Sequence, residues 1–502
     1  MPDANPLSSI LAEPFAPDLP TLWAYLEHHA GAKPNAQAVI DGQTRWTWAM
    51  LQARASEYAD GLVRYGAGQG DTIAMLSHSN AEFLACFLGT VRIGATWLGL
   101  NPKHTDEELL YVLGQAKPKL IIGYRTLADR NYETALSHDA LFLDDTAARS
   151  AFFASAEPVE WPTEDASQPA FMVFTSGSSG QPKAALLSQY GLIQAAQNRI
   201  RAWQHDGWRT LVNLPINHIG AVGDLCCTVL LAGGAYAFME RFDAAGSLDM
   251  IEREKLTLWF QVPTQLQLSL ATEQAETADL SSLKAVVWSG APASLGLVEE
   301  LRRRFPGMLA TDYSMTESIG AISMTPLMND LDTLTKTAGW PVPGRNVRLC
   351  ADEICIQDDA IFSGYLNAPN TDAFDANGAF KTGDLGKLDE AGRLTITGRA
   401  KDMFKSGGYN VYPREVEQVL EGHEAVAMAA VVAAKDPVFG EVGHAYILPS
   451  RAAQPTDQML SDFARTKLAN YKVPKKITIS ADLPLLPIGK IDKKALKASV
   501  RS

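Results

Sequence analysis

The sequence predicts a protein of two domains, a large α/β domain followed by a small α+β domain. The first reason is length, because 502 residues exceed what a single hydrophobic core organises. The second is the alternation of apolar strands with amphipathic helices, which is typical of mostly parallel sheets covered by helices on both faces. The third is a compact unit of about 100 residues after residue 400, the commonest size of a domain.

The first alternating region covers residues 22–123. Apolar residues at helical spacing predict helices at 22–31, 48–65 and 106–113, and a further helix up to residue 91 that Asn80 caps. Short apolar runs bounded by turn residues predict a hairpin at 39–47 and strands at 70–76, 95–100 and 119–123.

The second alternating region follows an apolar strand at 171–174. The same patterns predict helices at 189–202, 221–231, 264–272 and 297–305, and strands at 210–215, 255–262 and 283–288. From residue 338 the chain changes to short β segments with Gly and Pro turns, at 347–350, 353–356 and 394–397. The unit after residue 400 combines strands at 403–404, 426–432 and 444–447 with helices at 413–420 and 457–468. We therefore expect αβαβα parallel-sheet subdomains and a β-rich subdomain in residues 1–400, and an α+β domain in residues 401–502.

Composition and charge exclude several classes of protein. Apolar and charged fractions of 46% and 20% are ordinary for a globular protein, and a formal charge of −13 argues against a general nucleic-acid binder. The first 20 residues lack the pattern of a signal peptide and the apolar runs are too short for membrane spans, so we expect a cytoplasmic protein. The five cysteines form no CxxC pair and are expected to be buried, reduced thiols.

A loop of small residues follows the strand at 171–174 and predicts a phosphate site. It comprises Thr175, Ser176, Gly177, Ser178, Ser179 and Gly180, and Lys183 closes it. Glycines and small hydroxyl residues expose successive backbone N–H groups that wrap phosphate oxygens, and a lysine adds a point charge. The spacing is not that of a Walker A loop, which needs G-x4-G-K-[ST]. The alternative is a flexible Ser/Gly linker, which the preceding strand and the closing Pro-Lys disfavour.

Four further motifs follow this loop in order. They are Asp312-Tyr-Ser-Met-Thr-Glu317, Lys381-Thr-Gly-Asp384, Gly398-Arg-Ala-Lys-Asp402 and Pro487-Ile-Gly-Lys490. With the loop, this set resembles the adenylate-forming superfamily: acyl- and aryl-CoA synthetases, 4-coumarate–CoA ligase-like enzymes, firefly luciferase and peptide-synthetase adenylation domains. The resemblance covers nearly the whole chain, and five ordered motifs over more than 300 residues make it specific.

The resemblance implies an ATP-dependent acid–CoA ligase of the acyl-CoA synthetase branch. A hydrophobic carboxylic acid (aryl, alicyclic or medium to long acyl) attacks the α-phosphate of ATP and gives acyl-AMP and pyrophosphate, and the acyl group then passes to the thiol of coenzyme A. ATP, Mg²⁺ and coenzyme A are the implied cofactors and co-substrates. The resemblance leaves a monomer and a homodimer open.

The resemblance also assigns an ATP site. The loop from Thr175 to Lys183 would hold the β- and γ-phosphates, Thr316 would contact the α-phosphate, and Glu317 would hold Mg²⁺, which prefers carboxylate and phosphate oxygens. Asp384 would bind the ribose hydroxyls with Arg399 beside it. The adenine slot would be lined by Gly290, Ala291, Pro292, Asp312 and Tyr313, and Tyr313 can stack on the base.

Lys490 is the implied catalytic cation, bridging the substrate carboxylate and the α-phosphate as two anions meet. The segment 463–502 carries ten Lys and Arg against two Asp and Glu, a net charge of +8 on an acidic chain. The alternative interpretation is one more exposed lysine in this basic tail. The motif that contains Lys490, rather than the charge, favours the catalytic role.

The small C-terminal domain is implied to be mobile, with its hinge at Lys401 and two poses, one for each half-reaction. In the second pose Ser406, Gly407 and Gly408 would line the pantetheine tunnel. Phosphates and adenine of coenzyme A would meet Phe439, Tyr471, Lys472 and Lys475, although lysines beside an aromatic ring are also common as solvated surface groups.

The acid pocket is the least specified region. By family position it would use His218, Gly220, Phe260, Trp288, Gly290 and Ser314. His218 would guide the acid or shape the pocket wall, and a hydrogen-bonded core histidine is the alternative. Small residues such as Gly220 leave room for a bulky hydrophobic acid.

Three positions depart from the family pattern. Ala184 stands where glycine is usual, Gln189 where histidine is frequent, and Asp312 where Gly, Asn or Gln is commoner. The reaction class is unaffected by these changes, and the substrate is left undefined.

Three other functions remain open from the sequence. A stand-alone adenylation enzyme would load a carrier protein instead of coenzyme A. A phosphoryl transferase would release ADP. A degenerate nucleotide sensor would form no acyl-AMP, which the presence of Thr175, Lys183, Glu317, Asp384, Arg399 and Lys490 disfavours.

Overall fold

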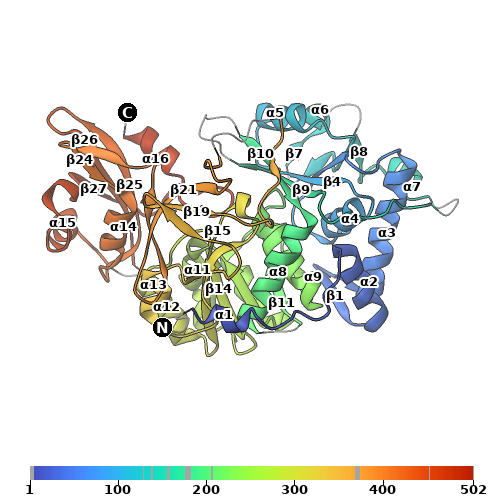
Figure 1. The fold of residues 1–502 in the computed structure, drawn as a ribbon, viewed down its shortest axis with the longest axis horizontal. Helices are drawn as coiled ribbons and strands as arrows, with labels where there is room; N and C mark the ends of the chain where they lie inside the picture. The colour runs from blue at the N-terminus through green and yellow to red at the C-terminus, as the bar shows by residue number, and fades with distance from the viewer. Residues whose placement is uncertain are drawn as a thin grey trace.

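The computed structural model describes residues 5–127, 129–136, 140–154, 159–175, 182–204, 207–367, 373–450 and 453–500. The elements cross the molecule from α3 and α4 at one end, through α8 in the middle, to the C-terminal sheet at the other end (Figure 1). Within the described ranges, no helix is both long and apolar enough to cross a membrane. Four of the five cysteines are buried free thiols, and Cys350 is half-buried.

A seven-stranded sheet forms the N-terminal part, in the order β20-β10-β9-β4-β3-β5-β8. Its strands are β3 (Thr72–Leu76), β4 (Thr96–Leu100), β5 (Leu120–Gly123), β8 (Ala140–Phe142), β9 (Pro169–Thr175), β10 (Lys183–Ser188) and β20 (Gly364–Tyr365). β9, β4, β3, β5 and β8 run parallel, whereas β10 pairs antiparallel with β9, and β20 pairs antiparallel with β10. The loop after β9 therefore connects two antiparallel strands.

Helices that begin at polar caps cover this sheet. Asn80 accepts a hydrogen bond from the backbone N–H of Phe83, as the sequence predicts, and Thr105 forms a capping box with Glu108. The helices and the small hairpin of this part are α2 (Leu22–Ala32), α3 (Trp48–Arg64), α4 (Ala81–Arg92), α5 (Asp106–Ala116), β6 (Thr126–Leu127), β7 (Arg130–Asn131), α6 (Glu133–Leu136) and α7 (Thr146–Phe153).

A nine-stranded sheet forms the centre, in the order β17-β16-β15-β14-β13-β11-β12-β1-β2. Its strands are β1 (Gln37–Asp41), β2 (Thr44–Thr47), β11 (Arg209–Val212), β12 (Ala235–Phe238), β13 (Leu258–Gln261), β14 (Ala285–Ser289), β15 (Met308–Ser314), β16 (Ala321–Met324) and β17 (Trp340–Pro341). The strands from β15 to β1 are parallel. The hairpin β1–β2 thus joins this sheet rather than its neighbour in sequence, a long-range pairing that local patterns do not reveal.

Helices cover both faces of the central sheet. They are α1 (Leu7–Ile10), α8 (Gln189–Trp203), η1 (Gly220–Cys226), α9 (Cys227–Ala232), α10 (Ala244–Glu254), α11 (Pro263–Leu270), η2 (Glu273–Glu276), α12 (Leu295–Arg304), η3 (Thr316–Ser318) and α13 (Leu331–Lys336). The helix predicted at 221–231 begins as the π-helix η1 and becomes α-helical only at Cys227. Such π segments appear frequently at functional sites.

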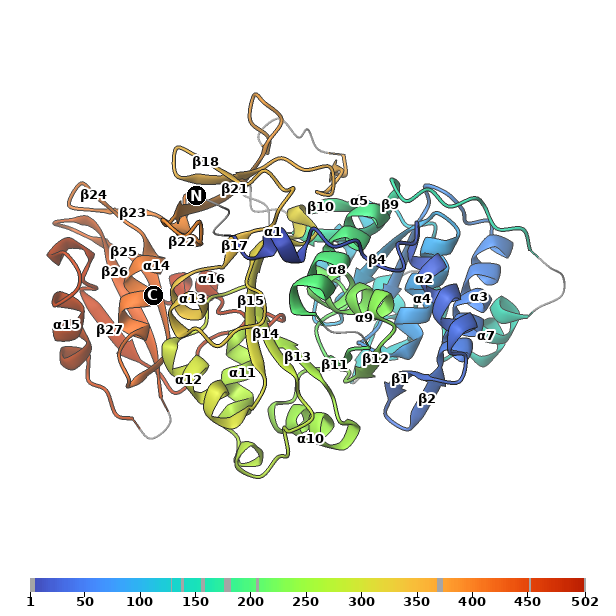
Figure 2. The same cartoon turned by 60° about the horizontal axis from the view of Figure 1, so that its bottom comes forward.

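Two smaller sheets complete the chain (Figure 2). The first contains β18 (Arg348–Cys350), β19 (Glu353–Ile356), β21 (Phe380–Leu388) and β22 (Leu394–Arg399). The second, C-terminal sheet contains β23 (Phe404–Ser406), β24 (Tyr409–Val411), β25 (Val426–Asp436), β26 (Gly440–Pro449) and β27 (Lys476–Ile479). It packs with α14 (Pro413–Glu421), α15 (Asp457–Arg465), η4 (Asn470–Lys472) and α16 (Lys493–Ser499).

Alternation along the central strands divides the core into two layers. On β13, Phe260 belongs to the large cluster shared with α8 and α9, whereas Trp259 belongs to the cluster under α10 and α12. On β14, Val287 and Trp288 separate in the same way. The carboxyl ends of the parallel strands, where open α/β sheets bind ligands, lead into the polar segments that follow Thr175, Ser289 and Ser314.

Candidate active site

The β9–β10 hairpin places Thr175 and Lys183 directly opposite each other. The predicted loop residues Ser176, Gly177, Ser178, Ser179 and Gly180 lie outside the described residues. Thr175 Oγ1 lies 3.2 Å from Glu317 Oε1, to which it donates a hydrogen bond. The two ends of the loop and the predicted metal ligand therefore meet, although 142 residues separate Thr175 from Glu317.

Glu317 is held by a second hydroxyl group. Tyr365 on β20 donates a hydrogen bond of 2.8 Å to Glu317 Oε1, and its ring lies 5.3 Å from the Lys183 ammonium. Both bonds use Oε1, so Oε2 remains for a cation. Since no cluster of three His, Cys, Asp or Glu side chains exists in the described part of the chain, Mg²⁺ here would take Glu317 and phosphate oxygens, ligands that this hard ion prefers.

A second cluster forms around Asp384. Asp384 and Arg399 are paired across β21 and β22, and Arg399 Nε donates to Asp384 Oδ1 at 2.7 Å. The Tyr313 hydroxyl donates to Asp384 Oδ2 at 2.7 Å. Burial and the Asp384 charge raise the pKa of Tyr313 well above its ordinary value, so the phenol stays protonated. The carboxylate is thus fixed at the position that a ribose would approach.

Lys490 extends from a tight turn of the C-terminal part towards Gly290, Asp384 and Arg399, and we refer to the region among these four residues as the cleft. Leu486 and Lys490 are joined by a 2.7 Å backbone hydrogen bond that closes the turn. Gly290, with φ of +83°, lies so close that a Cβ atom there would be 2.6 Å from Lys490 Cε. Gly290 is therefore needed both for its backbone conformation and for the room it gives Lys490.

The charges of the cleft act on Lys490. Burial, followed by the Arg399 charge, lowers the pKa of its ammonium group to about 8, while Asp384 and Asp224 oppose this shift. The lysine is thus still protonated at neutral pH, but it is poorly solvated. An incoming pair of anions would compensate the positive charge of the Lys490 ammonium group.

His218 lies near the same lysine. Burial, followed by the Lys490 charge, lowers the pKa of His218 to about 3, so its ring is neutral. The backbone N–H of Gly220 donates to His218 Nδ1 at 3.0 Å, which places the ring proton on Nε2. A neutral histidine with an available Nε2–H is suited to donate to a carboxylate.

The predicted acid-pocket residues do not all present their side chains to one space. Phe260 packs with Trp203 at 6.2 Å between ring centroids, on the α8 side of the central sheet. Ser314 lies 3.2 Å from Ser289 through their hydroxyl groups. The Trp288 side chain lies on the opposite face, under α10 and α12, because strand alternation turns it away from Phe260.

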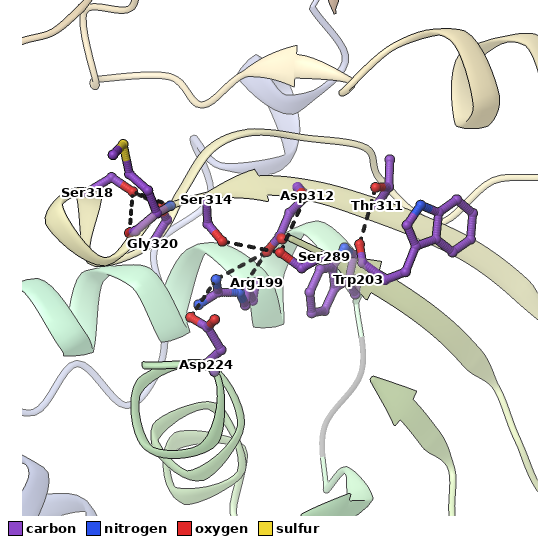
Figure 3. Close-up of polar contacts among 12 residues, drawn as sticks. Arg199, Trp203, Asp224, Ser289, Thr311, Asp312, Ser314, Ser318 and Gly320 are labelled. Atoms are coloured by element: carbon purple, nitrogen blue, oxygen red, sulfur yellow. Dashed lines mark hydrogen bonds and ion pairs between the residues drawn. The ribbon is translucent and has the colours of Figure 1, made fainter. Parts of the chain in front are cut away.

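The predicted adenine residues occupy the open side of the cleft. Gly290, Ala291 and Pro292 are exposed after β14, and Tyr313 lies on the neighbouring strand β15. Thr316 is nearly buried at the turn that connects β15 to β16. Asp312 was predicted to line the adenine slot, but its side chain forms an ion pair with Arg199 on α8 (Figure 3).

The residues predicted for coenzyme A gather on the C-terminal sheet. Gly407 and Gly408 form the β23–β24 turn with φ of +58° and +89°, and the N–H of Gly407 donates to the carbonyl of Phe439 at 2.9 Å. Lys475 lies 5.0 Å from the Phe439 ring, and Tyr471 stacks on Tyr409 at 4.6 Å.

This group of residues is separate from the nucleotide cleft. β24 lies at the outer edge of the molecule in both views, whereas α8 lies at its centre (Figures 1 and 2). Lys472 is occupied by an ion pair of 2.5 Å with Glu415, and Ser406 is buried. The structure therefore brings Gly290, Asp384, Arg399 and His218 together with Lys490, but not the residues predicted for coenzyme A.

Sequence patterns missed two polar residues of the site. Tyr365, which holds Glu317, follows no motif. Arg199 lies within an ordinary helical pattern, and a buried arginine has no local signature. The unusual Asp312 was the available signal, since a carboxylate in a buried strand requires a partner.

Two α/β sheets whose strand ends meet a lysine from a separate C-terminal sheet define a protein of the adenylate-forming class. The AMP-binding enzyme family matches residues 26–366, and its C-terminal domain matches residues 415–490. The chain therefore belongs to the AMP-binding enzyme family.

The chain is similar to ligases over nearly its whole length. It is 32% identical to a feruloyl-CoA synthase of Amycolatopsis sp, covering 94% of this chain and 96% of that protein. It is 29% identical to the long-chain-fatty-acid–CoA ligase FadD13 of Mycobacterium tuberculosis, covering 94% and 97%. The solved structure of o-succinylbenzoate CoA synthetase of Bacillus subtilis with its acyl-adenylate intermediate matches with a TM-score of 0.80 and 27% identity, covering 94% and 97%.

Proposed function

We propose that the protein is an AMP-forming acid–CoA ligase that activates a hydrophobic carboxylic acid. The observation that carries the proposal is the position of Lys490, whose stem lies against Gly290 in a cleft shared with Asp384, Arg399 and His218. A cation at this point serves a reaction in which a carboxylate meets a phosphate. The named relatives, a feruloyl-CoA synthase and a long-chain-fatty-acid–CoA ligase, support both the acid class and the acceptor.

In the first half-reaction a carboxylate oxygen attacks the α-phosphorus, the bond to the bridging oxygen breaks, and pyrophosphate leaves. Lys490 neutralises the two anions as they approach, and Thr316 contacts the α-phosphate. Asp384, with Tyr313 and Arg399, holds the ribose, and Gly290, Ala291 and Pro292 line the adenine. The loop closed by Lys183 holds the departing phosphates. Mg²⁺ on Glu317 would neutralise phosphate charge when bound.

In the second half-reaction the thiol of coenzyme A attacks the acyl carbonyl carbon, and AMP leaves with the bonding electrons. We propose domains at 1–400 and 401–502, with Lys401 as the hinge that brings Ser406, Gly407 and Gly408 to the acyl-AMP. The position of β24 at the outer edge, with Lys490 in the cleft, favours this rotation, because one pose cannot serve both steps. We further propose a cytoplasmic location.

The distinguishing experiment measures products from ATP, Mg²⁺, coenzyme A and a panel of fatty, aryl and alicyclic acids. The proposal requires AMP, pyrophosphate and an acyl-CoA in equal amounts. ADP as the nucleotide product would indicate phosphoryl transfer instead. Transfer to a phosphopantetheinylated carrier but not to coenzyme A would indicate the carrier-loading alternative.

A further inference from the structure

A buried cluster of three charged side chains lies beside the acid site: Arg199 on α8, Asp224 on η1 and Asp312 on β15 (Figure 3). Arg199 Nη2 lies 2.8 Å from Asp224 Oδ1 and 3.1 Å from Asp312 Oδ2, and Nε donates to Asp312 Oδ2 at 3.2 Å. Arg199 and Asp312 side chains have no exposure, and that of Asp224 has 5%. Charge is therefore concentrated where the fold gives it little water.

The three side chains do not satisfy one another. Arg199 Nη1 and Asp312 Oδ1 are buried and have no hydrogen-bond partner among the residues that the structure describes. Two carboxylates also share one guanidinium. A buried donor and a buried acceptor of this cluster are thus unpaired, although buried polar groups normally find partners.

The surroundings of this cluster link it to the acid site. Asp224 lies one helical turn beyond Gly220 on the π-helix η1, and Gly220 contacts His218. Asp224 and Lys490 also affect the pKa of each other through their charges. Ser314, which is partly exposed, joins Ser289, whose hydroxyl lies 3.4 Å from the carbonyl of Asp312.

We propose that Arg199, Asp224 and Asp312 recognise a hydroxyl group on the substrate and thereby select hydroxylated acids. This inference rests on the proposed function and narrows its substrate class. Arg199, Asp224 and Asp312 come from three elements that only the fold brings together.

A hydroxyl group suits the unpaired hydrogen-bond donor and acceptor of this cluster better than other polar groups do. It donates one hydrogen bond and accepts up to two, so it serves a carboxylate oxygen and Arg199 Nη1 at once. A carbonyl group would accept a hydrogen bond from Nη1 but could donate none to the carboxylates. An ammonium would donate to the carboxylates but meet the guanidinium with like charge. A plain hydrocarbon would leave the donor and the acceptor unpaired.

The test compares acids that differ at one group on the same skeleton. Cinnamate, 4-hydroxycinnamate and 4-methoxycinnamate form one set, and octanoate with 8-hydroxyoctanoate forms another. Pyrophosphate release gives kcat/KM for each acid. We expect the hydroxylated acid to exceed its parent by at least about tenfold on the skeleton that fits, because a site built for a hydroxyl rejects the analogue that lacks it.

Two variants separate recognition from folding. Asp224→Asn keeps the shape, and the triple variant Arg199→Met, Asp224→Asn, Asp312→Asn removes the charges together. We expect the ratio of kcat/KM for the hydroxylated acid to kcat/KM for its parent to fall at least about tenfold in each variant. Glu421→Gln, which alters a buried ion pair with Arg414 in the C-terminal sheet region, is the matched control and should leave the ratio unchanged.

Each outcome has a distinct meaning. Equal kcat/KM for hydroxylated and parent acids in the wild-type enzyme would overturn the inference and leave the ligase function standing. Equal loss for both acids in Asp224→Asn would assign the cluster a structural role and also overturn it. Absence of pyrophosphate release with every acid would refute the proposed function, and the inference with it.

Discussion

Among single side chains, Lys490 must combine a positive charge with burial. It must be charged when two anions meet, yet burial lowers the pKa of its ammonium group to about 8. Gly290 gives it room, and the turn closed between Leu486 and Lys490 fixes its origin. The charge is therefore placed at a cost to its solvation, which ATP and the acid offset when they bind.

Lys490→Ala removes this charge from the first half-reaction. We expect the rate of acyl-AMP formation to fall by about 10²–10³-fold, the usual effect of deleting one preorganised donor. Transfer from added acyl-AMP to coenzyme A should stay within a few-fold of the wild-type rate. Pyrophosphate release and thioester formation are measured separately. Equal losses in both assays would contradict the assignment of Lys490 to adenylation alone.

The pH dependence of adenylation follows from the same group. Because the pKa of Lys490 is lowered to about 8, the charged form prevails below that pH and is lost as the pH rises through it. We expect kcat/KM for the acid to fall about tenfold per pH unit above 8. Lys490→Arg is the control, since arginine stays charged, and its slower reaction should lack this decline. The same decline in the arginine variant would assign it to another group.

For single residues, the sequence predicted those that belong to ordered motifs. It missed those whose partners lie far away along the chain. Lys183, Glu317, Asp384, Arg399 and Lys490 follow from patterns of neighbours along the chain. Tyr365 and Arg199 do not, because their partners are 48 and 113 residues away. The orientation of Trp288 was also beyond prediction, since a strand buried on both faces gives no period of two.

Among the elements, α14 and α16 set the position of the Lys490 turn. Lys493, at the start of α16, forms an ion pair of 2.5 Å with Glu417 on α14. Glu417 is nearly buried and also accepts a hydrogen bond of 2.8 Å from the backbone N–H of Val431 on β25. The turn is thus anchored to the body of the C-terminal sheet three residues after Lys490.

Lys493→Met should therefore act through Lys490. We expect adenylation to slow by about three- to tenfold, because small misplacements of a reacting group are costly. The midpoint of thermal unfolding should change little, since the nearly buried Glu417 carboxylate keeps Arg414 and the backbone N–H of Val431 as partners. Lys497→Met, on the same helix, is the matched control. Equal kinetics in the two variants would rule out positioning through Glu417.

The elements also show where sequence patterns reach their limit. The helices and strands that were predicted in both alternating regions match observed elements within a few residues, because burial on one face leaves a clear period, whereas β12, α10 and β15 were not predicted. The π-helical form of η1 was not, since a helical pattern does not distinguish i+4 from i+5 hydrogen bonds. The pairing of β1 with β12 depends on a contact across nearly 200 residues.

For the molecule as a whole, two groups of residues face different directions. The stem of Lys490 lies against Gly290, whereas Gly407 and Gly408 form the turn between β23 and β24, and β24 lies at the outer edge of the molecule (Figures 1 and 2). Both groups belong to one sheet and its turns. A rotation about the segment after Arg399 would exchange them, and Lys401 is exposed in the turn that follows β22.

Lys401→Pro should restrict that rotation. Proline fixes its own φ and limits the preceding residue, so the turn between Arg399 and Asp402 loses alternatives. We expect acyl-AMP formation to remain within a few-fold of wild type and thioester formation to fall at least about tenfold. Lys401→Ala removes the side chain without fixing the backbone and should be nearly normal in both assays. Loss of both activities in both variants would exclude a hinge role for this residue.

The rotation itself can be measured as a distance between spin labels. Ser281 and Gln458 are exposed on the central sheet side and on α15, so single cysteines there carry nitroxides after Cys350 is replaced by serine. With ATP and an acid but no coenzyme A, we expect one narrow distance distribution, because Lys490 then keeps the C-terminal domain in the adenylation pose. An unreactive acyl-adenylate analogue with coenzyme A should shift the main distance, since the residues around Gly407 must then reach the acyl group. Lys401→Pro should retain the first distribution under both conditions. One unchanged distribution in a wild-type enzyme that makes acyl-CoA would show that a single pose serves both half-reactions.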